Sequence, residues 1–173
     1  MEELLKPISD WFTSKEGHLR AFAECDSRVE GWFKGEFLVL LRNLEATGVI
    51  RSFEREPKLQ TTAGRKQVDF RVSLRAGDVL LELKAVCISR AAGTPRDLAF
   101  YFRDDDVGLV KDFRKLDSRA TGNKAVIGFV YPNPPRPAWE RIVHGLPDDV
   151  AHWSCLTSPG DYPSHVFVSL WRP

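Results

Sequence analysis

Apolar residues follow a helical period through the first quarter of the chain. Residues 1–24 carry five of them, which predicts one or two short packing helices: Leu4, Leu5, Ile8, Trp11 and Phe12. A longer helix is predicted to reach about Ala46, and its apolar side chains bury most of one side: Val29, Trp32, Phe33, Phe37, Leu40, Leu41 and Leu44.

The ends of this longer helix carry capping signals. Asp26 or Ser27 is the expected N-cap, and Glu30 is spaced to complete a capping box with Ser27. Gly48 lies where a C-terminal cap is expected, because glycine adopts the left-handed conformation that often ends a helix.

The pattern then changes to the two-residue period of strands. Residues 49–56 predict a first strand, and the polar residues 58–66 predict a loop. Residues 67–74 alternate, so one face should carry the apolar set and the other the polar set: Val68, Phe70, Val72 and Leu74 against Gln67, Asp69, Arg71 and Ser73. A turn leads into residues 79–88, the most apolar run, which predicts a central strand.

The remainder of the chain predicts a crossover helix and three more strands. Leu109, Phe113 and Leu116 recur at helical spacing up to about Ser118. Further elements are expected over residues 125–131 (strand), 138–144 (short helix), 152–156 and 166–171 (strands). The order predicts a mixed α/β domain with a mixed sheet, in which the first three strands are antiparallel and the fourth follows a crossover helix.

Composition narrows the class of protein. The 173 residues fit one domain, and 43% hydrophobic with 28% charged residues is typical of a globular chain. The net charge of +1 means that any nucleic-acid contact must come from a local basic patch. The three cysteines are far apart and odd in number, which argues against a disulfide framework and favours a reducing cytoplasm. No run reaches the roughly 18 apolar residues of a membrane span.

The most informative chemistry lies in the two middle strands, at Asp69 and at Glu82-Leu83-Lys84. Charges inside an apolar strand cost free energy unless they are paired or bind a metal. Glu82 and Lys84 share one strand face about 6.5 Å apart. A two-residue turn at Ala76-Gly77 would set Asp69 opposite Lys84, and Arg71 opposite Glu82.

These three residues together suggest an ion site. Two carboxylates and a nearby carbonyl oxygen are ligands suited to Mg²⁺, and Lys84 could orient a water or neutralise charge on a phosphate. Two plainer interpretations stay open at this point. Glu82 and Lys84 could form an exposed pair on an edge strand, and Asp69 could serve a loop hydrogen bond.

The order Asp69, Glu82, Lys84 over residues 27–131 resembles the PD-(D/E)xK nuclease superfamily, whose members have the restriction-endonuclease-like fold. Val68 stands where the name-giving proline of that family would be. The resemblance implies a core of helix, three strands, helix and strand, with residues 1–26 and 132–173 as additions to a single domain.

The resemblance also implies metal-dependent hydrolysis of DNA. Asp69, Glu82 and the backbone carbonyl of Leu83 would bind Mg²⁺, with Mn²⁺ as a substitute, and Lys84 would activate the attacking water. An acid of the preceding helix would support the metal. Glu36 is favoured, because it lies mid-helix beside buried positions, and Glu30 is the alternative, since it could instead be a cap residue.

Basic and aromatic residues supply a candidate nucleic-acid surface. They lie before the second strand, after the third, and along the crossover helix: Arg65, Lys66, Arg90, Arg96, Tyr101, Arg103, Lys111, Arg114, Lys115 and Arg119. The alternative for the helical positions is a solvated face, and Phe100 and Phe102 of this segment could equally be core.

DNA is the expected partner, and the resemblance implies a homodimer in which each site cuts one strand. Trp153 and Trp171, in the predicted C-terminal strand pair, are candidates for the dimer surface. The competing hypothesis is a nucleic-acid-binding or assembly module that retains the fold without turnover. An enzyme that needs a partner subunit is a further alternative.

Overall fold

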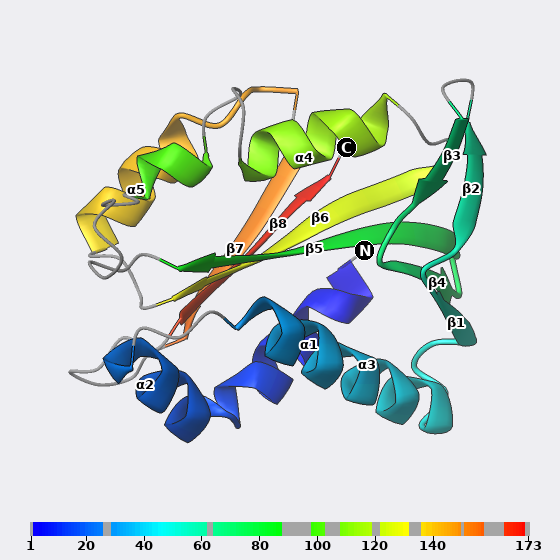
Figure 1. The fold of residues 1–173 in the computed structure, drawn as a ribbon, viewed down its shortest axis with the longest axis horizontal. Coiled ribbons are helices and arrows are strands. Elements are labelled where there is room, and N and C mark those ends of the chain that lie inside the picture. Colours follow the sequence, from blue (N-terminus) through cyan, green and yellow to red (C-terminus); the bar gives the residue numbers. More distant parts are fainter. Residues whose placement is uncertain are drawn as a thin grey trace.

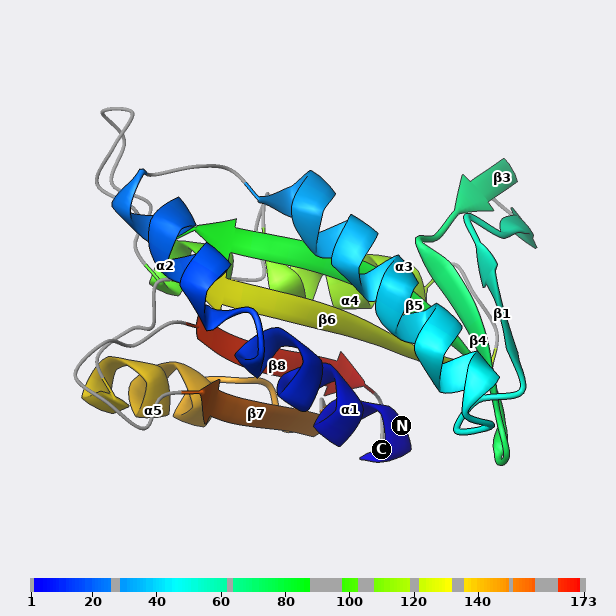
Figure 2. The same ribbon diagram turned by 90° about the horizontal axis from the view of Figure 1, so that it is seen from below.

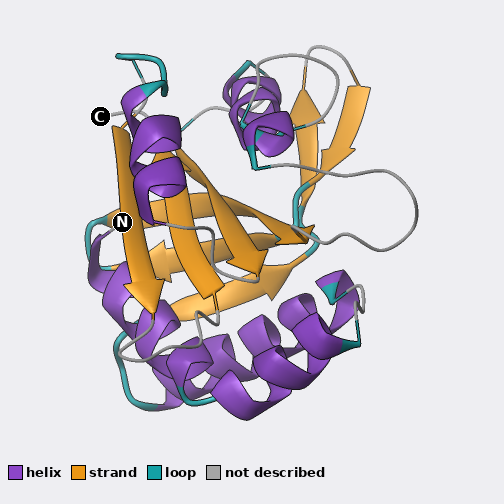
Figure 3. Cartoon of the chain, turned by 90° about the vertical axis from the view of Figure 1, so that its left-hand side faces the viewer, coloured by secondary structure: helices purple, strands orange, loops and turns teal. Residues whose placement is uncertain are grey.

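The chain folds around one large mixed sheet. The computed structural model describes residues 2–25, 29–61, 64–87, 98–102, 108–118, 122–131, 136–149, 151–157 and 165–171. Six strands form this sheet in the order β1-β4-β5-β6-β8-β7, and β2 and β3 form a separate two-stranded sheet. Helices α1, α2 and α3 lie on one face of the large sheet, and α4 and α5 lie on the other (Figures 1 and 3).

The described helices match the helical periods of the sequence. Their bounds are α1 (Glu2–Thr13), α2 (Glu16–Glu24), α3 (Glu30–Ala46), α4 (Leu109–Asp117), α5 (Arg136–His144) and the short 3-10 helix η1 (Ala99–Tyr101). The predicted short helices near the N-terminus are confirmed as α1 and α2. No described helix is both long and apolar enough to cross a bilayer.

The strands confirm the predicted mixed α/β class. They are β1 (Ser52–Arg55), β2 (Lys58–Thr61), β3 (Gly64–Gln67), β4 (Phe70–Leu74), β5 (Gly77–Cys87), β6 (Asn123–Tyr131), β7 (Ala151–Thr157) and β8 (His165–Trp171). As predicted, β1, β4 and β5 pair antiparallel, and β6 runs parallel to β5 after the α4 crossover. β8 pairs antiparallel with both β6 and β7.

Two apolar clusters fill the spaces on either side of the sheet. One joins the first three helices to β4 and to the odd-numbered residues of β5, and it includes Phe12, Phe33, Phe37, Phe70, Val72, Leu81 and Leu83. The other packs under α4 and α5 and includes Val68, Leu80, Tyr101, Phe113, Leu116, Val126 and Trp139. Alternation along the central strand therefore decides which helical layer each side chain meets.

Helix α3 ends as predicted but begins differently. Gly48 has φ +72, and the Val49 N–H donates to the Leu44 carbonyl, so the last turn closes in a Schellman motif. At the other end Val29 is the N-cap, with no side-chain capping hydrogen bond. The expected caps Asp26 and Ser27 lie outside the described residues.

The prediction of a loop over residues 58–66 was wrong. The hairpin β2–β3 occupies this segment and projects beyond the β1–β4 edge of the main sheet (Figures 1 and 2). The predicted continuous strand 67–74 is likewise split, with β3 ending at Gln67 and β4 beginning at Phe70. The polar side chains of this segment lack the apolar alternation from which strands are predicted.

Candidate functional site

Asp69 lies at the bend between β3 and β4. Val68 is buried with the α4-side cluster, whereas Phe70 is buried with the α3-side cluster. The prediction that these two apolar residues share a face was therefore wrong. The chain changes faces at Asp69, and this frees its carboxylate from the ordinary alternation of a strand.

The carboxylate of Asp69 joins the central strand to helix α3. Oδ2 accepts a hydrogen bond from the Leu83 N–H at 2.8 Å, and Oδ1 forms an ion pair with Lys34 Nζ at 2.9 Å. If β4 continued without a bend, the Leu83 N–H would pair with its backbone. The side chain thus replaces a strand carbonyl, which is the loop hydrogen bond that the sequence left open as an alternative.

Glu82 and Lys84 project from β5 toward the opposite helical layer. Leu81 precedes Glu82, and Leu83 lies between Glu82 and Lys84. Both leucines pack on the α3 side, so the side chains of Glu82 and Lys84 point to the α4 side. Lys84 Nζ forms an ion pair with Asp112 of α4 at 3.2 Å. One carboxylate oxygen of Glu82, Oε2, is buried. The plain interpretation of an exposed pair on an edge strand does not fit, because β5 lies inside the sheet.

The strand register differs from the predicted one by a whole two-residue step. Phe70 pairs with Leu81 and Arg71 pairs with Leu80, so the prediction that Arg71 faces Glu82 was wrong. The tight turn is one residue earlier than expected, and Gly77 already pairs with Leu74. Extended by one residue, this register brings Asp69 level with Glu82, not with Lys84. A shift of two residues leaves the faces of the paired β4 and β5 residues unchanged. Asp69 lies at the bend before β4, however, and its carboxylate contacts Lys34 of α3, whereas Glu82 points toward α4.

The two helix acids have different surroundings. Glu36, the favoured residue, points to α1: its Oε2 accepts a hydrogen bond from Trp11 Nε1 at 3.1 Å and pairs with Lys15 Nζ at 3.4 Å. Glu30, the alternative, pairs with Lys34 Nζ at 3.3 Å and so belongs to the Asp69 network. These contacts assign Glu36 to helix packing and connect Glu30 to Asp69 through Lys34.

Lys34 is the electrostatic centre of this network. Partial burial lowers its pKa, but the hydrogen bonds and charges of Asp69 and Glu30 outweigh that effect and raise the pKa above the ordinary value of 10.5. The ammonium group is therefore held in its charged form by two carboxylates from different elements.

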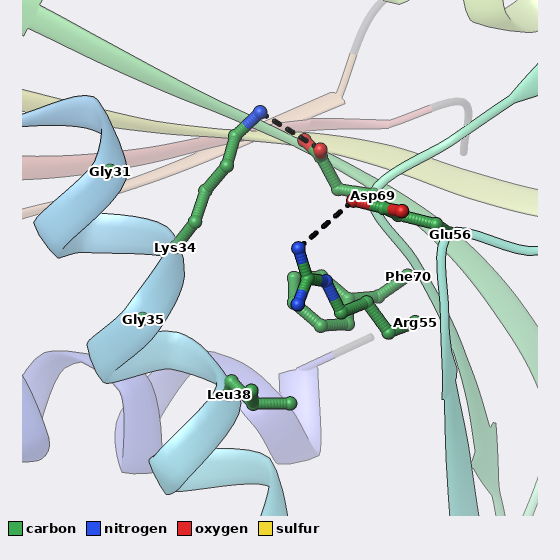
Figure 4. Close-up of a pocket in the computed structure, with 8 residues that line it drawn as sticks. All are labelled: Gly31, Lys34, Gly35, Leu38, Arg55, Glu56, Asp69 and Phe70. Atoms are coloured by element: carbon green, nitrogen blue, oxygen red, sulfur yellow. Dashed lines mark hydrogen bonds and ion pairs between the residues drawn. The ribbon is translucent and has the colours of Figure 1, made fainter.

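A pocket of about 330 Å³ opens beside Asp69, between α3 and the start of β4 (Figure 4). Its lining combines about two turns of the helix with the end of β1 and the bend before β4: Gly31, Lys34, Gly35, Leu38, Arg55, Glu56, Asp69 and Phe70. Glu56 has φ +52, an unusual backbone conformation for a residue other than glycine. Its carboxylate pairs with Arg55 and accepts a hydrogen bond from Gln67.

The predicted nucleic-acid surface is only partly described. Tyr101 is 4% exposed in the α4-side core, so its assignment to the candidate nucleic-acid surface was wrong. On α4, Lys115 is exposed, Lys111 is half-buried, and Arg114 pairs with Asp149 through both guanidinium nitrogens. The others lie outside the described residues or have undescribed side chains: Arg65, Lys66, Arg90, Arg96, Arg103 and Arg119.

Sequence reasoning missed Lys34 and Asp112, which contact the predicted site from helices in the described part of the chain. The spacing of Glu30 and Lys34 is the usual i, i+4 salt-bridge pattern, which looks like surface decoration. Asp112 lies in the first turn of α4, where an acid is favoured by the helix dipole whatever its partner. Neither pattern distinguishes a residue of a site from an ordinary helix residue.

The donor set suits a hard cation. Asp69, Glu82 and the Leu83 carbonyl are oxygen donors, and Mg²⁺ is usually held by one or two carboxylates with water in the other positions. The Leu83 N–H points to Asp69, and the carbonyl of the same residue leaves an extended strand on that same side. Within the described part of the chain, no cluster of three or more acidic, histidine or cysteine side chains could hold a metal.

No protein-family model, curated protein or solved structure matches this chain.

Proposed function

We propose that this chain is a metal-dependent nuclease that hydrolyses DNA phosphodiester bonds. The observation that supports it most directly is the hydrogen bond of 2.8 Å from the Leu83 N–H to the Asp69 carboxylate, which ties Asp69 to the strand that carries Glu82 and Lys84. Glu82 and Lys84 flank Leu83 on this strand, with the Glu82 side chain pointing toward α4 and the Asp69 carboxylate in contact with Lys34 of α3.

The order of elements supports the same proposal. α3, β1, β4, β5, α4 and β6 follow one another as in the restriction-endonuclease-like core, with the β2–β3 hairpin inserted before the acidic bend. Fold alone does not define an activity, because one fold supports many functions. The proposed activity therefore depends on Asp69, Glu82 and Lys84.

Each residue has a chemical role in the proposed reaction. Asp69, Glu82 and the Leu83 carbonyl would hold Mg²⁺, which when bound supplies a polarised phosphate and a more acidic water. Lys84 would hydrogen-bond the attacking water or a phosphate oxygen and offset the charge that develops there. Asp112 holds Lys84 from α4 at 3.2 Å and so limits the directions in which its ammonium group can point.

Substrate contact is proposed along α4. Lys111 and Lys115 lie one turn apart on α4. The same helix carries Asp112, which pairs with the proposed catalytic residue Lys84 of β5. Such contacts to phosphates would position a strand without reading its sequence. A homodimer would bring two such sites to the two strands of a duplex, in the cytoplasm.

Plasmid cleavage tests this proposal. We expect supercoiled plasmid to be nicked in Mg²⁺ or Mn²⁺, with Glu82→Ala and Lys84→Ala each about 100-fold slower or more, because each removes a group that acts on the transition state. The matched control is Glu54→Ala, which removes an exposed acid of β1 that pairs with Arg71 of β4. Equal cutting by the wild type and both site variants would indicate a contaminating nuclease and contradict the proposal.

The alternative is a binding or assembly module that keeps the fold without turnover. The ion pairs Lys34–Asp69 and Lys84–Asp112 favour it, since both satisfy charges of the site without a metal. Calorimetric titration with Mn²⁺ separates the two functions. A nuclease should bind the ion and lose it in Asp69→Asn, whereas the module should bind DNA but no metal.

A further inference from the structure

The Asp69 carboxylate already pairs with a cation of the protein, the ammonium group of Lys34. Of the two carboxylate oxygens, Oδ2 is bonded to the Leu83 N–H within the sheet, and Oδ1 lies 2.9 Å from Lys34 Nζ. A divalent cation that bound Asp69 would be attracted to the same oxygen and repelled by the same ammonium group. Lys34 and a metal therefore compete for one carboxylate.

Glu30 strengthens the hold of this lysine on the site. Its Oε1 lies 3.3 Å from the same Nζ, so acids from the first turn of α3 and from the strand bend converge on one ammonium group. The pair is also partly shielded, with the Asp69 side chain 16% exposed and that of Lys34 36% exposed. Reduced solvent screening makes the contact stronger than a fully exposed pair.

We propose that Lys34 is a positioning residue that competes with the divalent cation for Asp69 and so sets the metal concentration at which the site fills. This inference rests on the proposed function, whose metal it regulates. The pocket beside Asp69 gives the displaced lysine somewhere to go: Gly31 and Gly35 line it, and a Cβ built on either would meet nothing within 4 Å.

The competition predicts a gain of affinity when the lysine is removed. Replacing Lys34 by methionine removes the repulsion of the metal, while the Leu83 N–H still orients the Asp69 carboxylate. We expect Lys34→Met to bind Mn²⁺ about tenfold more tightly than the wild type. A purely structural role predicts the reverse, because loss of the ion pair would let Asp69 move.

Titration of the full chain with Mn²⁺, followed by calorimetry and by the electron spin resonance of free Mn²⁺, measures this difference. Lys34→Arg keeps the charge and should restore the wild-type affinity, and Lys34→Gln is a second neutral variant in case methionine impairs folding. Arg42→Met removes another cation of α3, one paired with Glu45, and should leave the affinity unchanged.

The outcomes separate this inference from the proposed function. If the wild type binds Mn²⁺ and Asp69→Asn does not, but both neutral Lys34 variants fold and bind no more tightly, the competition is refuted and the metal site stands. If the wild type and the neutral Lys34 variants all bind no Mn²⁺, or if Asp69→Asn keeps it, the metal site fails and the competition fails with it.

Discussion

Two lysine–aspartate pairs flank the central strand, and they are built in opposite senses. On one face the acid comes from the strand side and the lysine from helix α3, as Lys34–Asp69. On the other the lysine comes from β5 and the acid from helix α4, as Lys84–Asp112. Both pairs tie a helix to the sheet, but only Asp69 is also bonded to the backbone of β5.

Asp69 is therefore held through both of its carboxylate oxygens, whereas in the described part of the chain the Asp112 side chain is held by a single ion pair. Asp69 is 16% exposed and uses both of its oxygens, whereas Asp112 is 26% exposed and has Lys84 as its one side-chain partner within the described residues. A group held at two points loses less freedom when it acts on a ligand than a group held at one. We therefore expect substitutions of Asp69 and of Asp112 to differ in their effects on DNA cleavage and on folding stability.

The largest expected effect is on DNA cleavage. Asp69→Asn should slow Mg²⁺-dependent plasmid nicking by about 100-fold or more, since it removes a charge from the proposed metal ligands. Asp112→Asn should slow it by only about tenfold, because Lys84 keeps its charge and loses only its anchor. Initial rates at saturating Mg²⁺ measure both, and equal losses would contradict the distinction between the two acids.

The next effect is on folding stability. Asp69→Ala should lower the free energy of unfolding by about 2 kcal/mol, because it leaves the buried N–H of Leu83 without its acceptor. Asp112→Ala should cost less than about 1 kcal/mol, as is usual for a partly exposed ion pair. Urea unfolding followed by circular dichroism gives both values, and a larger loss in Asp112→Ala would reverse the comparison.

The smallest effect is a dependence on alkaline pH. The pKa of Lys34 is raised in the folded chain above 10.5, so folding favours its protonated form. That contribution is complete below pH 10.5 and is lost as the pH rises through the folded-state pKa. Because Lys34 is 36% exposed, the contribution should stay under about 1 kcal/mol.

Urea unfolding of the wild type and Lys34→Met at about pH 9 and about pH 11 measures this contribution. The advantage of the wild type at the lower pH should shrink at the higher one. An advantage that stays constant or grows would show that the ammonium charge of Lys34 does not stabilise the fold.

The sequence predicted the layers better than the site. Apolar periods located α3, α4, β5 and β6, because burial against a sheet requires them. The prediction that Val68 and Phe70 share a face was wrong, because the chain bends at Asp69 between them. Such a bend does not change the alternation of apolar and polar residues in the sequence.

The candidate site shows the same limit. Glu82 and Lys84 could be assigned to one face from their spacing alone, but Lys34 and Asp112 come from helices far away in the sequence. Glu36 looked like the better helix acid because it is flanked by buried positions, yet its neighbours on α1 account for that environment. Contacts between distant elements depend on packing, which a single sequence does not specify.

The hydrogen bond from the Leu83 N–H to a side chain, where a strand would ordinarily offer its backbone, makes this amide a natural reporter. Its proton resonance should respond to a change at the Asp69 carboxylate, because that carboxylate is the acceptor of its hydrogen bond. Adding diamagnetic Mg²⁺ to isotope-labelled protein would thus reveal occupancy of one carboxylate directly in an NMR spectrum, without any substrate.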